Sequence, residues 1–183
     1  NACVTIDGKA TCSPVLGRDT PEAYFNAFGG YIGLARGPSG LGLVTYDRVN
    51  GNLIAIAQAG GGWKQTILDG ETGSRKDKTA IDTGDTGVGA SLVIAEDGSF
   101  HVTYVSGLDE TLRYVTMKDN TPGKSEIIDD GSSVDGKPNA DGKHVVGDDS
   151  MVSIESAGAI RVFYQDATQG TLRMATGTVQ GGA

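Results

Sequence analysis

Residues 98–116, GSFHVTYVSGLDETLRYVT, decide the fold because the chain contains two further stretches like them. Residues 40–58 read GLGLVTYDRVNGNLIAIAQ, and residues 158–176 read GAIRVFYQDATQGTLRMAT. A period of 58 and then 60 residues results when the stretches are aligned on three tyrosines, Tyr46, Tyr104 and Tyr164. Self-similarity at a nearly constant period predicts that one supersecondary unit is built three times along the chain.

Each unit reads as three consecutive antiparallel strands. Asp97 and Gly98 join the apolar run ASLVI to an alternating strand, and this is a hairpin signal because glycine accepts the positive φ of a tight turn. In the second strand, alternation places Val102 and Tyr104 on one face, and we expect the aligned tyrosines in the core. A polar turn follows, and each third strand begins at a leucine: Leu53, Leu112 or Leu172.

A fourth strand completes the first two units, as WKQTILDG from Trp63 and KSEIIDDG from Lys124. Four antiparallel strands per unit form a β-propeller blade. The segment CVTIDG, from Cys3, ends in the same apolar, apolar, acid, glycine pattern. The sequence therefore predicts an all-β, β-propeller-like single domain or half-propeller. Its three four-stranded antiparallel blades are 30–70, 88–131 and 145–183, the last completed by residues 2–8 of the same chain or of a partner.

The block GASLVIAEDGSFHVTYVSGLDETLRYVT, residues 89–116, resembles the repeats of bacterial secreted or surface β-propellers. The shared features are a small-Ser-Leu first strand, an Asp-Gly hairpin and a second strand that ends in tyrosine. This resemblance covers most of the chain from about Gly30 onward and implies the fold without an active site. Propellers typically have about four to eight blades, so three do not close a ring. We therefore expect either a head-to-tail homodimer with six blades, or a piece of a longer chain or complex.

Charge disfavours two classes of partner. With 15 Lys+Arg against 23 Asp+Glu, the chain lacks the positive field that attracts nucleic acid or an anionic membrane surface. No apolar run approaches the roughly 20 residues of a membrane helix. We expect neither nucleic-acid binding nor membrane insertion.

The two cysteines, Cys3 and Cys12, are spaced so that a short hairpin can bridge them with a disulfide. The alternative is a pair of reduced thiols in a cytosolic protein, while a metal site lacks a histidine nearby in the sequence. The disulfide favours a secreted or cell-surface protein, in an extracellular or periplasmic space.

Three long connections, residues 9–30, 71–87 and 132–147, follow the predicted fourth strands and project on one face. Connections of this length are commonly functional. They supply candidate ligand-binding residues, namely Asp82, Asp85, Asp135, Asn139, Asp141 and His144. Calcium is the one cofactor suggested, through the carboxylates of Asp82, Asp85, Asp135 and Asp141. The alternative for these carboxylates is an Asx turn, in which each bonds its own backbone.

Trp63 and the two histidines complete the candidates. Trp63, the only tryptophan, is suited to stacking on a sugar ring, with packing between blades as the alternative. His101 is expected on the less buried face of a strand, and His144 in a solvated loop.

Two pairs of residues repeat between units. Asp69 and Asp129 recur after the fourth strands, which favours a structural turn over a unique chemical role. Arg113 and Arg173 hold equivalent positions on the third strands, with cross-strand pairing and anion binding as alternatives.

The sequence favours a non-catalytic binding or adhesion protein that recognises a glycan, a protein or an assembly partner through the long-loop face. No catalytic residue is assigned. One alternative is an extracellular propeller hydrolase or lyase acting on polysaccharide, which would use Asp82, Asp85, Asp135, Asp141 and His144. The other is a structural subunit of a surface assembly.

Overall fold

The structure is a computed structural model that describes residues 2–6, 9–13, 29–48, 50–59, 61–70, 85–133, 136–137, 139–155 and 158–179, the first two ranges by their backbone. These residues form β-strands and turns, with no helix among them. The part of the chain so described accordingly contains no helix that is long and apolar enough to cross a membrane. The all-β class predicted from the alternating sequence pattern is confirmed.

Three antiparallel sheets form the body of the molecule. The first sheet runs in the order β3 (Gly30–Gly37), β4 (Gly40–Asp47), β5 (Asn52–Ala59) and β6 (Gly62–Asp69). The second contains β7 (Thr86–Ile94), β8 (Phe100–Ser106) and β9 (Thr111–Lys118), and β9 also pairs with β10 (Thr121–Pro122) and β11 (Glu126–Asp129). The third is β12 (Val146–Ile154), β13 (Ala159–Asp166) and β14 (Thr171–Thr178). Each sheet is a meander, as the short predicted hairpins require.

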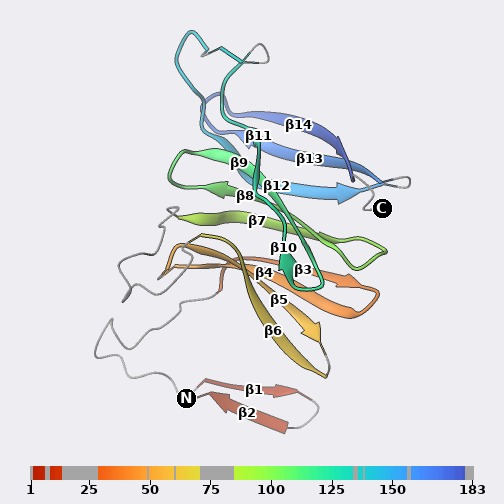
Figure 1. Cartoon of the computed structure of the whole chain (residues 1–183). Coiled ribbons are helices and arrows are strands. Elements are labelled where there is room, and N and C mark those ends of the chain that lie inside the picture. The colour runs from red at the N-terminus through yellow and green to blue at the C-terminus, as the bar shows by residue number, and fades with distance from the viewer. Residues whose placement is uncertain are drawn as a thin grey trace, which may run out of the picture.

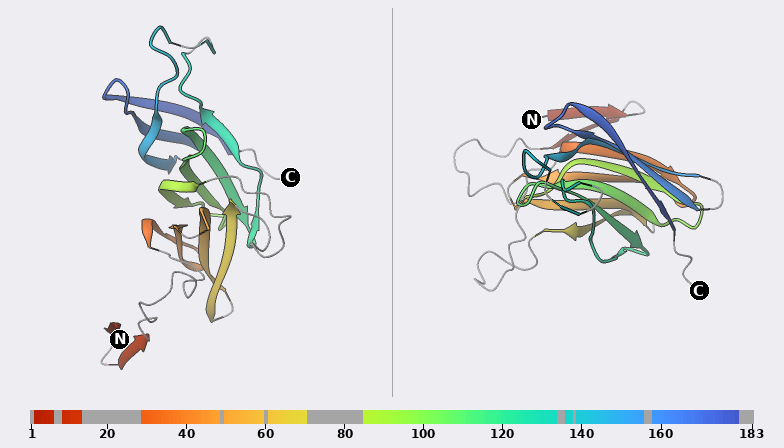
Figure 2. Two further views of the ribbon diagram at one scale, coloured as in Figure 1. Left: turned by 90° about the vertical axis from the view of Figure 1, so that its left-hand side faces the viewer. Right: turned by 90° about the horizontal axis from the view of Figure 1, so that it is seen from above.

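The second sheet lies between the other two (Figures 1 and 2). Strand β7 packs against β3 and β4, and β12 packs against β7 and β8. The burial of the strands agrees with this order of the sheets. Every residue of β8, in the second sheet, is buried, whereas buried and exposed residues alternate along β13, in the third sheet. The second sheet is therefore covered on both faces and the third sheet on one.

Each of the two joints between sheets has its own hydrophobic core. Between the first and second sheets, Val44 and Val102 are fully buried and belong to one cluster. Between the second and third sheets, Leu112 and Val162 are buried in another. Full burial of such a side chain stabilises the fold by about 1.5–3 kcal/mol, so these joints hold the stack together.

The alignment on three tyrosines is wrong by one residue in the first unit. Strand pairing shows that Thr45 stands opposite Ile54, as Tyr104 stands opposite Arg113 and Tyr164 opposite Arg173. The cause is the hairpin between β3 and β4. Four residues separate Arg36 from its partner Leu41, whereas five separate Ile94 from Phe100 at the equivalent positions of the second sheet. Tyr46 consequently faces the second sheet, where its hydroxyl donates to Asp85 at 2.8 Å.

A bulge near the start of each first strand repeats more regularly than the tyrosines. Gly29, Gly87 and Gly147 have φ of 110, 106 and 104°. Two residues later the backbone is left-handed again, at Tyr31, Gly89 and Asp149. An added Cβ on Gly147 would lie 2.9 Å from side-chain atoms of Leu112 and Val105, so glycine is needed there for both φ and space.

The fourth strands also agree with their predicted positions. WKQTILDG forms β6, and KSEIIDDG contains β11. The N-terminal strand β1 (Ala2–Ile6) pairs with β2 (Lys9–Ser13), and no pairing of β1 with the third sheet occurs within the described residues. Completion of a last blade by residues 2–8 and the total number of blades stay predictions.

Candidate functional site

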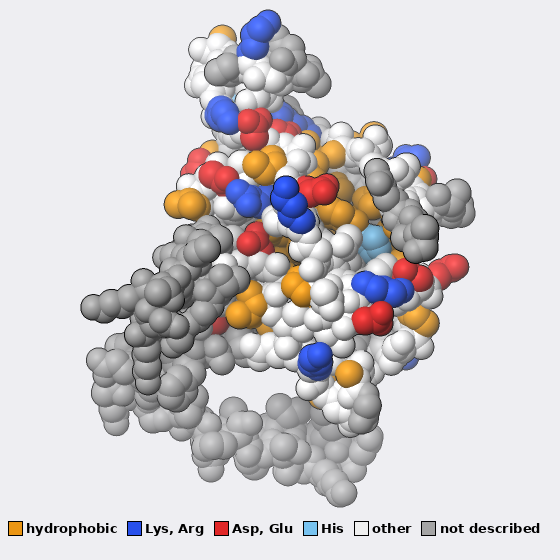
Figure 3. All heavy atoms as spheres, viewed as in Figure 1, with side chains coloured by type: hydrophobic (Ala, Val, Ile, Leu, Met, Phe, Trp, Pro, Cys, Tyr) orange, Lys and Arg blue, Asp and Glu red, His pale blue; other side chains and the backbone are white. Residues whose placement is uncertain are grey.

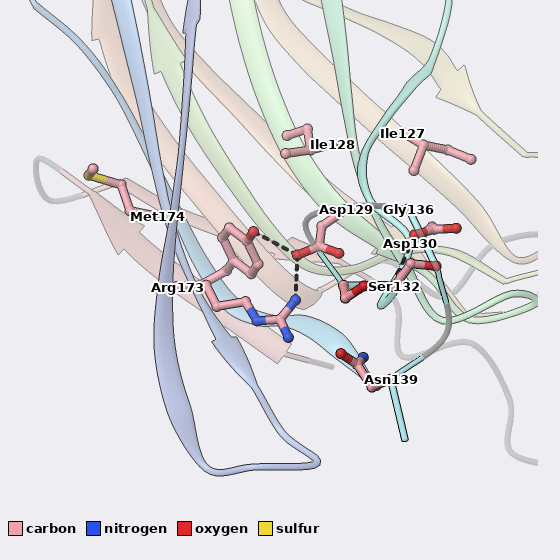
Figure 4. Close-up of a pocket in the computed structure, with 11 residues that line it drawn as sticks. Ile127, Ile128, Asp129, Asp130, Ser132, Gly136, Asn139, Arg173 and Met174 are labelled. Atoms are coloured by element: carbon pink, nitrogen blue, oxygen red, sulfur yellow. Dashed lines mark hydrogen bonds and ion pairs between the residues drawn. The ribbon is translucent and has the colours of Figure 1, made fainter. Parts of the chain in front are cut away.

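A cavity of about 700 Å³ opens where the second sheet meets the third at the ends of β11 and β14. Ile127, Ile128 and Asp129 line it from β11, and Arg173 lines it from β14. The connection between β11 and β12 contributes Asp130, Ser132, Ser133, Gly136 and Asn139. In Figure 4, the Arg173 side chain points toward Asp129, whereas that of Met174 points away from both.

Arg173 is held between two carboxylates. Its Nη1 lies 2.9 Å from Asp129 Oδ2, and its Nη2 lies 2.5 Å from Asp166 Oδ2. The Tyr164 hydroxyl donates to Asp129 Oδ2 at 2.8 Å, which joins the two sheets. Burial, and then the bond to Asp129, raise the pKa of Tyr164, so the hydroxyl stays a donor. Arg173 is thus fixed in position and its charge is neutralised.

His144 belongs to the same hydrogen-bond network and bonds two carboxylates. Its Nδ1 lies 2.6 Å from Asp166 Oδ2, and its Nε2 lies 3.0 Å from Asp141 Oδ1. The bonds to Asp166 and then Asp141 raise the pKa of His144. Burial raises the pKa of Asp166, but the bonds from His144 and Gln169 and the Arg173 charge outweigh it and lower that pKa overall. Both His144 and Arg173 therefore donate to the ionised Asp166 and lie side by side, 3.2 Å apart.

The local backbone explains how the connection reaches the cavity. Asp129 Oδ1 accepts from the Gly131 amide at 2.8 Å, and Gly131 O accepts from the His144 amide at 2.9 Å. An added Cβ on Gly131 would lie 2.0 Å from His144 O, so only glycine allows this approach. On the outside, Lys143 lies 2.5 Å from Asp130 and lowers the pKa of that carboxyl to about 2.

Part of the predicted site is brought together here. Asn139 lines the cavity and donates to Gly131 O, His144 adjoins it through Asp166, and Asp141 bonds His144. Asp85 lies elsewhere, at the joint between the first and second sheets, bonded to Tyr46. Asp82 and Asp135 lie outside the described residues. Trp63 is 54% exposed on β6 of the first sheet.

The expected exposure of both histidines is wrong. His144 is only 3% exposed, because Asp166 reaches it from the end of β13. His101 is only 2% exposed, because its face of β8 is covered by the third sheet. The His101 ring bonds the hydroxyls of Ser99 and Tyr114, and burial lowers its pKa.

Sequence reasoning missed the main residues of this site. The aspartates at positions 69 and 129 were interpreted as turn residues because they repeat, but both accept a hydrogen bond from a tyrosine of the next sheet, Tyr104 or Tyr164. The tyrosine and the aspartate lie 35 positions apart in both pairs, so this constant spacing was a usable signal.

Among the described residues, no group of three or more His, Cys, Asp or Glu side chains is arranged to hold a metal ion. Calcium binding by Asp82, Asp85, Asp135 and Asp141 stays a prediction, since two of these residues lie outside the described ranges.

Acidic and basic side chains are interspersed over the face of the molecule shown in Figure 3.

Comparison with known proteins assigns no family. No family model matches the chain, and no curated protein matches it. A similar solved structure is a bifunctional GH43-CE protein from Bacteroides eggerthii, 13% identical, with a TM-score of 0.36. The match covers 82% of this chain and 18% of that one. The chain thus spans less than a fifth of that protein.

Proposed function

We propose that the three sheets are blades of a β-propeller, secreted or at the cell surface, that binds a neutral glycan without catalysis. The arrangement that carries this proposal is Arg173 fixed between Asp129 and Asp166 at the rim of a cavity with the apolar side chains of Ile127 and Ile128. Sugars offer hydroxyl groups to such fixed donors and acceptors and place their C–H faces against apolar side chains.

Charge favours a neutral ligand over an anionic one. Among the described residues that line the cavity, Asp129, Asp130 and Arg173 are charged, and Lys143 pairs with Asp130 from outside the lining. The single arginine is already paired with two carboxylates. A phosphate, sulfate or carboxylate would be repelled by Asp129 and Asp130, whereas hydroxyl groups can donate to them.

Protonation favours binding over glycoside hydrolysis. A glycosidase needs one carboxylic acid that stays protonated near neutral pH, beside a second that is ionised. The pKa values of Asp130, Asp141 and Asp166 are lowered by their hydrogen-bond partners, so these groups are ionised. Asp129 accepts hydrogen bonds from both Arg173 and Tyr164.

A glycan array that includes neutral, sialylated and sulfated glycans tests the proposal, followed by calorimetric titration of the strongest ligand. We expect neutral glycans to bind and Arg173→Lys, which loses the bidentate geometry, to weaken binding about tenfold or more. Arg161→Lys is the matched control, because Arg161 lies on the other face of the third sheet and pairs with Glu155.

A second variant separates ligand contact from effects on folding. Ile127 is exposed, so Ile127→Ala should leave the fold intact and weaken binding by about tenfold through lost apolar contact. Leu108→Ala, at an exposed turn leucine, should bind as the wild type does. Preference for anionic glycans, or hydrolysis of a bound neutral one, would contradict the proposal.

Secretion has its own test. Strands β1 and β2 pair so that Cys3 stands opposite Cys12. We expect these two residues to form a disulfide, and therefore both to resist alkylation until a reductant is added. Alkylation of both thiols in the untreated native protein would contradict an extracellular or periplasmic location.

A further inference from the structure

The two joints inside the molecule are built from apolar residues at equivalent positions of successive sheets. On the second sheet, Leu92, Val102 and Val115 stand side by side on adjacent strands and pack against the first sheet. On the third sheet, the equivalent row packs against the second sheet and consists of Val152, Val162 and Ala175. An apolar row across three strands is therefore the surface with which a sheet covers the one before it.

The first sheet carries the same row, and this row is exposed at Leu34 although Thr45 and Ile54 on the same face are buried. Leu34, Leu43 and Ile56 stand side by side at the equivalent positions, on the face turned away from the second sheet. Leu34 is 64% exposed, whereas Val102 at the centre of the second sheet's row is fully buried. The pairing register places Trp63 and Ile67, also exposed, on this same face.

The third sheet carries the opposite half of such a joint. Its outer face presents Met151, Phe163 and Met174 side by side, with exposures of 68, 40 and 51%. A hollow of about 450 Å³ lies on this face beside Met151, Phe163 and Leu172. On the second sheet, the equivalent row includes Ser91 and is covered by the third sheet. The contact is shown by the hydrogen bond that Ser91 Oγ accepts from the Val152 amide at 3.2 Å.

We infer that the outer face of the third sheet docks on the outer face of the first sheet of a second copy of this chain. One chain carries both halves of the joint, so two copies placed head to tail cover all four apolar faces with two identical contacts. Exposed apolar side chains gathered on one face are typical of an interaction surface. The internal joints also fix the register: Gly33 lies against Leu92, as Ser91 lies against Val152. Met151 should therefore meet Leu34 of the second copy.

This docking differs from the internal joints in one respect. Tyr104 and Tyr164 each bond an aspartate of the preceding sheet, but Thr45 stands at that position in the first sheet. Thr45 instead bonds the backbone of Gly29 and Gly30. Contact between copies thus rests on the apolar rows without a Tyr–Asp bond.

Light scattering on a size-exclusion column tests the inference across a hundredfold dilution range. We expect a mass of twice 18.8 kDa for the wild type, and a mass close to that of one chain for Leu34→Lys and for Phe163→Lys. Both positions are exposed in the single chain, so lysine is tolerated by the fold, and Leu108→Lys is the matched control that should retain the wild-type mass.

Mixing the two lysine variants gives a sharper result. Each variant pairs with itself through two damaged contacts, whereas Leu34→Lys and Phe163→Lys together form one intact contact and should recover the doubled mass. A wild-type mass of 18.8 kDa throughout would overturn the inference. A mass that grows with concentration, unchanged masses for both variants, or no recovery on mixing would do so too.

Discussion

The hydrogen bond between Tyr104 and Asp69 offers a quantitative test of how the sheets are joined. Tyr104 is fully buried, and its hydroxyl contacts Asp69 of the first sheet and Ser125 of the second. Burial, and then the bond to Asp69, raise the pKa of Tyr104, so the hydroxyl remains protonated and donates to the carboxylate. Ser125 then donates to the tyrosine oxygen at 2.5 Å.

Tyr104→Phe keeps the ring and removes only this hydroxyl. A hydrogen bond to a charged group is worth about 1.5–3 kcal/mol, so we expect a loss of about 2 kcal/mol in the free energy of unfolding. For a chain of this length, that is a fall of roughly 4–8 °C in Tm. Tyr164→Phe should cost only about 1 kcal/mol, because Asp129 keeps its bond to Arg173.

Urea unfolding followed by circular dichroism, at one fixed protein concentration, measures these differences. Tyr31→Phe is the control, because Tyr31 is an exposed tyrosine of the first sheet and should change stability little. A double-mutant cycle with Asp69→Ala should give a coupling of at least about 1 kcal/mol. Equal losses for Tyr104→Phe and Tyr164→Phe, or negligible coupling, would refute the proposed role of this bond.

Two further predictions concern titration and backbone strain. Histidine NMR signals should titrate above pH 6.5 for His144 and below it for His101. Charged His144 then stabilises the fold fully below pH 6.5, and this stabilisation is lost as the pH rises through the raised pKa of His144. The reverse order of the two titrations would contradict the hydrogen-bond network around His144. Gly147→Ala should destabilise the fold by more than about 2 kcal/mol. Gly89→Ala should cost only about 1 kcal/mol, because the atom nearest to an added Cβ there is 3.6 Å away. Equal losses of stability in urea unfolding would argue against the repeated bulge.

The sequence was sufficient for the strands and hairpins, because alternation and turn residues are local signals. The Asp97-Gly98 hairpin between β7 and β8 and the fourth strand at Trp63 are where the pattern places them. The register of β4 was missed, because one residue fewer in a hairpin moves every side chain to the other face. Alignment on Tyr46 hid this shift, since tyrosine happens to occur at the next position.

The site was predictable only in part, because its contacts join residues that are distant in sequence. His144 was expected in a solvated loop, yet its partner Asp166 lies at the end of β13 and buries it. The two equivalent arginines also diverge through their neighbours. Arg113 pairs with Asp109 of its own turn, whereas Arg173 reaches across to Asp129. The local sequence pattern identifies both arginines, but it does not determine which carboxylate each arginine pairs with.

The most direct test of the account, in which the stack of sheets continues from one copy to the next, is a cross-link between two copies, through Leu34→Cys and Met151→Cys in one chain. These positions lie on opposite outer faces of three stacked sheets, so a link within one chain is excluded at the roughly 10 Å spacing of each sheet pair. Mild oxidation should give a covalent dimer with both substitutions present, and none with either alone. Failure of the doubly substituted chain to cross-link, or equal cross-linking of the single variants, would contradict the account.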